Sequence, residues 1–161
     1  MPVLHSEIGG QAKTPDGKIV NVPRQAILAQ VGPRVAITLM PPDQLVAALT
    51  KEGKPIPSAI TGLALIDTGA GPTSIDEDAA KKLGLPIINV VKLASASHPS
   101  TDAHVYPVKF AITGLPNAIN APQVVGAPLA CQGLLALIGR DLLSVCHFTY
   151  NGAAGQFTLC I

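Results

Sequence analysis

Short runs of alternating apolar residues, separated by glycine and proline, extend through most of this chain of 161 amino acids. In two segments, Arg34–Met40 and residues 104–112, apolar side chains recur at every second position, so they share one face of a strand. The two faces consist of Val35, Ile37 and Leu39 and of Tyr106, Val108, Phe110 and Ile112. With 15 glycines and 15 prolines ending the runs, the pattern predicts an all-β domain, mainly strands with one or two short helices.

The remaining segments follow from the same pattern. Strands are predicted over residues 18–22, 25–31, 34–40, 60–66, 104–112, 134–138, 148–150 and 156–161, with a further strand beginning at Val124. A helix is predicted over residues 43–53, with Asp43 as N-cap and Gly53 at its C-terminal end. A second is predicted over residues 77–83, with Asp76 as N-cap, or Ser74 in an alternative capping box. Residues 93–104, rich in Ser and Ala, are expected to form a loop.

Three cysteines, Cys131, Cys146 and Cys160, are spaced too widely for a zinc site because the chain contains no C-x-x-C. If residues 151–155 form the loop of the last hairpin, Cys146 lies opposite Cys160. A disulfide between them remains an alternative, whereas two reduced, half-buried thiols are the favoured interpretation.

Composition limits the classes of partner. Lys and Arg total 11 against 10 Asp and Glu, without a basic run, so neither nucleic acid nor an anionic membrane is an expected partner. Charged residues make up only 13% and hydrophobic residues 48%, which favours a single domain that buries part of its surface against another protein. No apolar stretch has membrane-spanning length and no signal-peptide pattern begins the chain, so a cytoplasmic location is expected.

The strongest chemical signal is an acid that directly follows a buried strand. Ile60–Ile66 runs into Asp67, and the following residues close a tight turn. A carboxylate at the end of a buried strand is costly unless it has a partner or a function. A turn residue without function is the alternative. The apolar triplet that precedes Asp67, Ala-Leu-Ile, recurs once, directly before Gly139-Arg140-Asp141.

The segment ALIDTGAGPTSID at residues 64–76, with ALIGRDLL at residues 136–143, resembles the retropepsin-like aspartic proteases, the retroviral protease family and its cellular relatives. The order of elements is similar too: strand, DTG turn, helix, small-residue flap, strand, and an apolar segment ending in G-R-D. The resemblance covers residues 34–161 and leaves residues 1–33 as N-terminal strands or an extension. It implies a closed barrel with one lobe per chain, active as a symmetric dimer.

The resemblance further implies an aspartic endopeptidase without a cofactor. Water would be activated between two Asp67 carboxylates that share a proton, to cleave an extended peptide. Because D-T-G occurs once, the second carboxylate must come from a second copy of the chain. Thr68 would brace the two turns across the dimer axis, and Gly69 would let the substrate backbone approach closely. Ala70 has no hydroxyl to stabilise the ionised carboxylate, which predicts activity at mildly rather than strongly acidic pH.

Support for this turn is expected from Thr73, Gly139, Arg140 and Asp141. Asp141 is expected to accept a hydrogen bond from Thr73 or from helix amides. In retroviral members an acid shortly after the DTG turn pairs with the arginine of the second motif. Gly71 and Pro72 occupy that stretch here, so the partner of Arg140 stays open, either elsewhere in the chain or at the dimer interface.

The flap candidates are Ala96, Ser97 and His98, in a stretch poorer in Gly and Ile than the retroviral flap. His98 is interpreted as a solvated loop residue or, alternatively, as a group near the ligand. No metal site is expected, since the histidines lack metal spacing. A non-catalytic dimerisation or peptide-binding module on the same fold is the alternative function. The intact Asp67, Thr68 and Gly69 favour the enzyme.

Overall fold

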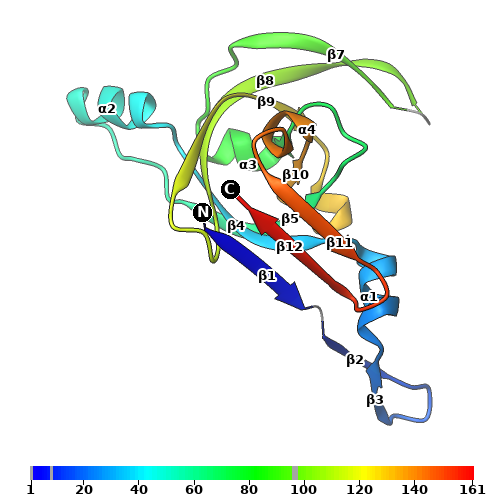
Figure 1. The fold of residues 1–161 in the computed structure, drawn as a ribbon. Coiled ribbons are helices and arrows are strands. Elements are labelled where there is room, and N and C mark those ends of the chain that lie inside the picture. Colours follow the sequence, from blue (N-terminus) through cyan, green and yellow to red (C-terminus); the bar gives the residue numbers. More distant parts are fainter. Residues whose placement is uncertain (1, 8, 96–97) are drawn as a thin grey trace.

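Six strands close into a barrel in the computed structural model, which describes residues 2–7, 9–95 and 98–161 (Figure 1). Around the barrel the order is β4 (Arg34–Met40), β5 (Ile60–Ile66), β10 (Ala136–Ile138), β6 (Ser74–Asp76), β9 (Ala118–Ala127) and β8 (His98–Ile112). Pairing of β4 with β8 closes the ring. The prediction of a mainly β, closed barrel is therefore confirmed.

Strands outside the barrel form three further features. They are a long hairpin of β7 (Asn89–Ser95) with β8, a sheet of β1 (Val3–Glu7), β12 (Gln156–Cys160) and β11 (His147–Asn151), and a hairpin of β2 (Gly10–Lys13) with β3 (Ile19–Val22). The β7–β8 hairpin arches past the top of the barrel, and the β2–β3 hairpin projects from the opposite end of the molecule (Figure 1). Pairing of β1 with β12 joins the two ends of the chain in one sheet.

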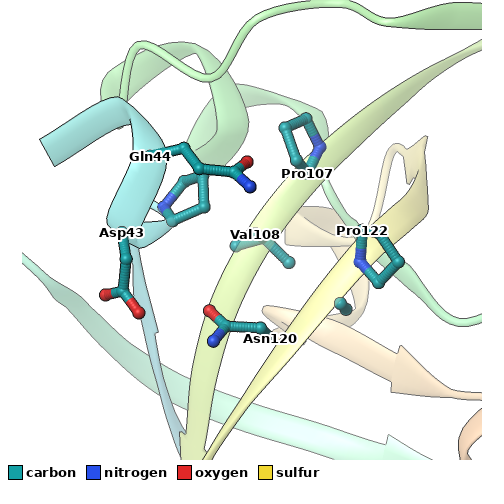
Figure 2. A pocket seen from close by; sticks show the side chains of 8 residues that line it. Asp43, Gln44, Pro107, Val108, Asn120 and Pro122 are labelled. Carbon is teal, nitrogen blue, oxygen red and sulfur yellow. The ribbon is translucent and has the colours of Figure 1, made fainter. Parts of the chain in front are cut away.

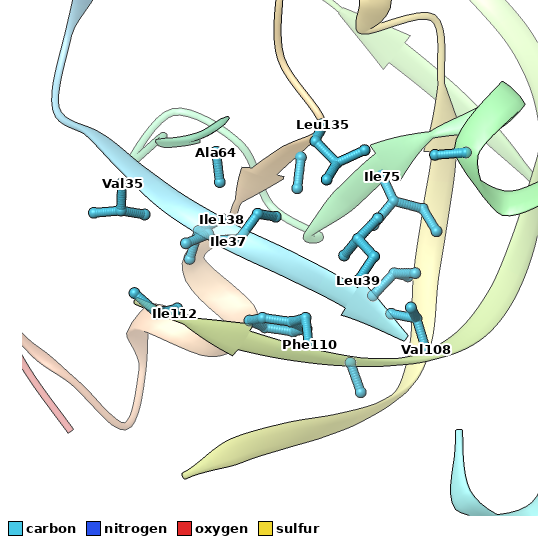
Figure 3. Close-up of a cluster of buried hydrophobic side chains, with 14 of the residues drawn as sticks. Val35, Ile37, Leu39, Ala64, Ile75, Val108, Phe110, Ile112, Leu135 and Ile138 are labelled. Carbon is cyan, nitrogen blue, oxygen red and sulfur yellow. The ribbon is translucent and has the colours of Figure 1, made fainter. Parts of the chain in front are cut away.

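The barrel interior is filled by the two apolar faces that the sequence predicts. Ile37, Leu39 and Val108 are at most 1% exposed, and their neighbours point inward from the surrounding strands (Figure 3). The buried set includes Val35, Ile37, Leu39, Ala64, Ile66, Ile75, Tyr106, Val108, Phe110, Ile112, Ala136 and Ile138. Each large side chain removed from water stabilises the fold by about 1.5–3 kcal/mol. This core fixes the strand ends from which the candidate site is built.

The helices are α1 (Arg24–Val31), α2 (Asp43–Lys51), α3 (Glu77–Lys82), α4 (Arg140–Leu143) and the 3-10 turn η1 (Ala130–Gln132). The strand predicted over residues 25–31 is wrong, because this segment is α1. Pro23 precedes the helix at φ −56°, and Gly32 ends it at φ 73°, which glycine adopts without strain. Leu28 is fully buried, so tertiary packing stabilises a segment whose own pattern is ambiguous. No helix in the described part of the chain is both long and apolar enough to cross a membrane.

The two other helix predictions differ in their outcome at the N-cap. Asp76 caps α3 as predicted, because its Oδ1 accepts a hydrogen bond of 3.1 Å from the Ala79 amide. In α2 the N-cap is Pro42 rather than Asp43, which is the first helical residue. The Asp43 carboxylate instead accepts a 2.7 Å hydrogen bond from Lys109 on β8, so a partner distant in sequence competes with the local cap.

The loop predicted over residues 93–104 is wrong over the described residues. β7 and β8 pair from Asn89 opposite Val105 to Ser95 opposite His98. Backbone hydrogen bonds between the strands do not require large apolar side chains, so Ser and Ala are accommodated. β9 likewise begins at Ala118, before the predicted start at Val124, because β8 provides an adjacent edge along its length.

The last hairpin is shifted by one residue from its predicted register. Its loop is residues 152–155, so Asn151 lies opposite Gln156, and His147 instead of Cys146 lies opposite Cys160. All three cysteines are free thiols, which agrees with the favoured interpretation of reduced cysteines.

Candidate active site

Two strands that end in the same three residues pair in register and bring the two motifs together. β5 and β10 are parallel, with Ala64 opposite Ala136 and Ile66 opposite Ile138. The amide of Asp67 continues the ladder with a 3.0 Å hydrogen bond to the Ile138 carbonyl. The repeated triplet of the sequence is therefore a structural repeat, and it places the turn after Asp67 beside the turn after Ile138.

The Asp67 carboxylate is held by the amides of its own turn. Its Oδ1 accepts hydrogen bonds from Gly69, at 2.8 Å, and from Ala70, at 3.3 Å. Within the described chain no hydrogen bond involves Oδ2. A β-carbon on residue 69 would lie 3.1 Å from Oδ1, so glycine leaves room for the carboxylate. The turn thus orients one carboxylate oxygen and leaves the other available, while Thr68 and Gly69 are exposed.

Helix α4 contacts the turn through its first amides. The Arg140 amide donates a 3.0 Å hydrogen bond to the Ala70 carbonyl, and the Asp141 amide donates one of 3.2 Å to the Gly71 carbonyl. At Gly139 the two segments approach so closely that a β-carbon would lie 2.6 Å from the Pro72 carbonyl group. Only glycine permits this approach, so the G of G-R-D is a steric requirement.

Asp141 and Thr73 connect the same two segments through side chains. The Asp141 carboxylate accepts hydrogen bonds from the Thr73 amide, at 2.8 Å, and the Thr73 hydroxyl, at 2.7 Å. The Thr73 hydroxyl in turn accepts a 3.0 Å hydrogen bond from the Gly139 amide. Asp141 also accepts one from the Leu142 amide, so both predicted kinds of donor are confirmed.

Arg140, whose partner the sequence left open, binds the turn itself. Its Nη1 donates hydrogen bonds to the carbonyls of Thr68, at 2.8 Å, and Gly69, at 3.0 Å. Among the described residues no ion pair involves Arg140. The guanidinium therefore supports the turn through neutral carbonyl groups.

A cleft of about 580 Å³ lies between Gly71 and Pro72, which follow the turn, and the hairpin arm β7, a volume typical of ligand sites. Its lining is Gly71, Pro72, Val91, Lys92, Leu93, Val105, Gln123, Val125 and Asp141. Sequence reasoning missed the lining residues of β7, β8 and β9, because the pairing that carries them to the turn is not encoded locally. A separate pocket of about 340 Å³, formed by α2, β8 and β9, has no residue of the turn in its lining (Figure 2).

The flap candidates are only partly described. Ala96 and Ser97 lie outside the described residues. His98 is the first residue of β8 and pairs with Ser95 of β7. The described part of the β7–β8 hairpin lines the cleft through Val91, Lys92, Leu93 and Val105, and the flap stays a prediction.

A polar cluster that sequence reasoning missed joins α3 to β8. The Glu77 carboxylate lies 2.8 Å from His104 Nδ1 and 3.3 Å from the Tyr106 hydroxyl. The hydrogen bond with His104 holds the pKa of Glu77 below its ordinary value, and burial raises the pKa of Tyr106. The one sequence feature that indicates this cluster is the two-residue spacing of His104 and Tyr106, which puts both side chains on the same face of a strand. No group of three or more potential metal ligands occurs in the part of the chain that the structure describes.

Comparison with known proteins gives one kind of match. No protein-family model and no curated protein sequence matches the chain. Among solved structures it is similar to a retropepsin-like aspartic protease from Rickettsia conorii, with 16% sequence identity and a TM-score of 0.45. The alignment covers 98% of this chain and 92% of that protein.

Proposed function

We propose that this chain is an aspartic endopeptidase that acts as a homodimer, with one Asp67 from each copy. The observation that carries the proposal is the set of hydrogen bonds that orients the Asp67 carboxylate. The amides of Gly69 and Ala70 donate hydrogen bonds to Oδ1. Arg140 and Asp141 of α4 donate hydrogen bonds to backbone carbonyls of the turn and of Gly71. A carboxylate oriented in this way by the backbone around it suits proton transfer to and from a bound water.

The reaction requires two such carboxylates and one proton between them. Two like charges in hydrogen-bond range cannot both ionise cheaply, so one carboxylate is ionised and the other keeps its proton. The ionised group takes a proton from water as the water oxygen bonds to the peptide carbonyl carbon. The protonated group donates to the carbonyl oxygen. The resulting diol then loses its C–N bond: the nitrogen takes the proton that the first carboxylate removed from water, and a diol hydroxyl gives its proton to the second carboxylate. An amine and a carboxylic acid are released, and the pair again shares one proton.

Exposure of the turn supports the requirement for a second copy. Thr68 and Gly69 are both exposed, and the side chain of Leu63 on the strand that leads to them is 41% exposed. A two-fold axis passing near Asp67 would cover these residues and place the second carboxylate opposite the first. The composition, with few charges and much apolar surface, favours such an interface.

An extended peptide is the substrate class that the cleft favours. β7 lines one side of the cleft, and Gly71 and Pro72, which follow the turn, line another, so the cleft could hold an extended peptide strand between them. Val91 and Leu93 on β7 and Val105 on β8 add apolar wall for alternate side chains of the peptide.

The test compares wild type with Asp67→Asn and with Asp16→Asn, which changes an exposed acid in the β2–β3 turn. The measurement is cleavage of a diverse peptide library at mildly acidic pH. Asn keeps an Oδ1 acceptor for the turn amides but cannot act as base, so a loss of about 10²–10⁴-fold is expected. Asp16→Asn should cleave as wild type does.

Two results would overturn the proposal. One is equal cleavage by Asp67→Asn and wild type, and the other is a wild-type protein that cleaves no peptide. Sedimentation of the same samples tests the dimer. A dimer that binds peptides without cleaving them would identify the alternative, a non-catalytic binding module.

A further inference from the structure

Two neighbouring strands of the cleft wall are contacted by one carboxylate, that of Glu77 on α3, from the face that points away from the cleft. Val105 of β8 and Val125 of β9 lie opposite each other in the sheet, and both line the cleft. Successive residues of a strand point to opposite faces, so the two neighbours of Val105 point away from the cleft. These neighbours are His104 and Tyr106, whose Nδ1 and hydroxyl lie 2.8 and 3.3 Å from Glu77 Oε1.

The residue after Val125 leaves space for the same carboxylate on β9. This residue is Gly126, and a β-carbon there would lie 2.9 Å from Glu77 Oε2 and 2.9 Å from the Tyr106 ring. Gly126 is outside the left-handed region, so the close approach of the carboxylate, rather than the backbone conformation, requires glycine here. Glu77 is therefore packed against both strands that form this part of the wall.

The helix that carries Glu77 is itself fixed to the body of the protein. The preceding residue, Asp76, is only 7% exposed, and its Oδ1 accepts the Ala79 amide at 3.1 Å. Its Oδ2 accepts the amides of Leu129 and Ala130, at 3.1 and 2.9 Å. Asp76 thus joins the start of α3 to the segment that follows β9, so the adjacent Glu77 extends from a fixed base.

From this arrangement we propose that Glu77 is a positioning residue for the peptide, which holds the Val105–Val125 section of the cleft wall in place from the opposite face of the sheet. The proposal rests on the proposed peptidase function and adds a residue to it. Glu77 is not among the residues that line the cleft, so it acts through the strands rather than by contact with the peptide. A wall that is ordered before binding loses little conformational entropy when the peptide binds, which lowers KM.

The test separates the hydrogen bonds of Glu77 from its charge. Glu77→Ala removes the acceptor, whereas Glu77→Gln keeps an acceptor oxygen and is the rescue variant. Asp78→Ala is the matched control, because Asp78 is the next residue of α3 and is exposed. The ion pairs of Lys81 with Glu77, at 3.8 Å, and with Asp78, at 3.5 Å, lie on the surface and contribute little.

For cleavage of one peptide, Glu77→Ala should raise KM about fivefold with little change in kcat. Glu77→Gln and Asp78→Ala should stay within about twofold of wild type. A mere loss of folded enzyme would lower the apparent kcat and leave KM unchanged, so the two constants distinguish positioning from stability. An unchanged KM in Glu77→Ala would overturn the proposal.

A double variant tests whether Glu77 acts through His104. His104→Ala should also raise KM, and the double variant should raise it no further than Glu77→Ala does, because both changes remove the same interaction. Effects that multiply in the double variant would overturn the proposal, since the two residues would then act independently.

Two measurements do not require cleavage. Binding of the peptide to Asp67→Asn, followed by fluorescence anisotropy, should weaken about fivefold when Glu77→Ala is added. The Ile88 amide donates a 2.9 Å hydrogen bond to the Val105 carbonyl, and its hydrogen exchange should be faster in Glu77→Ala than in Asp78→Ala. If no peptide is cleaved but Glu77→Ala weakens binding and speeds this exchange, the proposed activity fails and this inference stands. Equal binding with and without Glu77→Ala, or equal exchange in the two variants, would overturn the inference alone, and a protein that binds no peptide would overturn both.

Discussion

The Asp141 carboxylate accepts hydrogen bonds from both the amide and the hydroxyl of Thr73, at 2.8 and 2.7 Å, although the two residues are 68 positions apart in the chain. Thr73 is only 2% exposed, so water cannot replace these hydrogen bonds if they are lost. The pair ties the segment after the DTG turn to the helix of the second motif.

Asp141→Ala should destabilise the fold by about 2–3 kcal/mol, because it leaves two buried donors of Thr73 without an acceptor. Asp141→Asn keeps one acceptor oxygen and should cost about 1 kcal/mol. Urea unfolding followed by circular dichroism measures both. A free energy of unfolding for Asp141→Ala equal to that of wild type would contradict the role assigned to this pair.

Gly139→Ala should destabilise the protein by about 1–3 kcal/mol, since its β-carbon would lie 2.6 Å from the Pro72 backbone. Backbone atoms cannot move aside as a flexible side chain can, so the turn must shift. The proposed peptidase activity should then fall more than the loss of folded protein explains. Gly9→Ala is the control, because a β-carbon there meets no described atom within 4 Å, and its unfolding midpoint should stay unchanged.

Glu77 should make stability depend on acid. Its hydrogen bond with His104 holds the pKa of Glu77 below the ordinary value of 4.5, so ionised Glu77 stabilises the folded state above pH 4.5. This contribution is lost as the pH falls below 4.5 and through the folded-state pKa. The difference in unfolding free energy between wild type and Glu77→Gln should shrink over that range. In a His104→Gln background the dependence should weaken, and a dependence that is unchanged there would exclude His104 as its cause.

Ala70→Ser should shift the activity optimum to lower pH by roughly half a unit, because a hydroxyl beside Asp67 stabilises the ionised carboxylate. Ala70 already directs its amide to Asp67 Oδ1, at 3.3 Å, so residue 70 is adjacent to the carboxylate. A pH profile of kcat/KM for both proteins measures the shift. An optimum that is equal or higher in the serine variant would disprove the argument.

The local sequence pattern was sufficient to predict structure where the environment of a residue depends on its neighbours in the sequence. The alternating faces of β4 and β8 and the Asp76 cap of α3 are of this kind. It failed at residues 25–31, where packing of Leu28 favours a helix, and at residues 93–104, where pairing between strands is sufficient without apolar side chains.

The sequence by itself determined strands β4, β5 and β10, the apolar face of β8 and the Asp67 turn, because apolar periodicity and turn chemistry are local. Only the tertiary structure decided what Arg140 binds, that Gly139 contacts Pro72, and that β7 forms a wall of the cleft. These relationships depend on parallel pairing of β5 with β10 and on closure of the barrel by β4 and β8. Residues far apart in the chain meet there, and their distances follow from packing of the whole core rather than from any short segment.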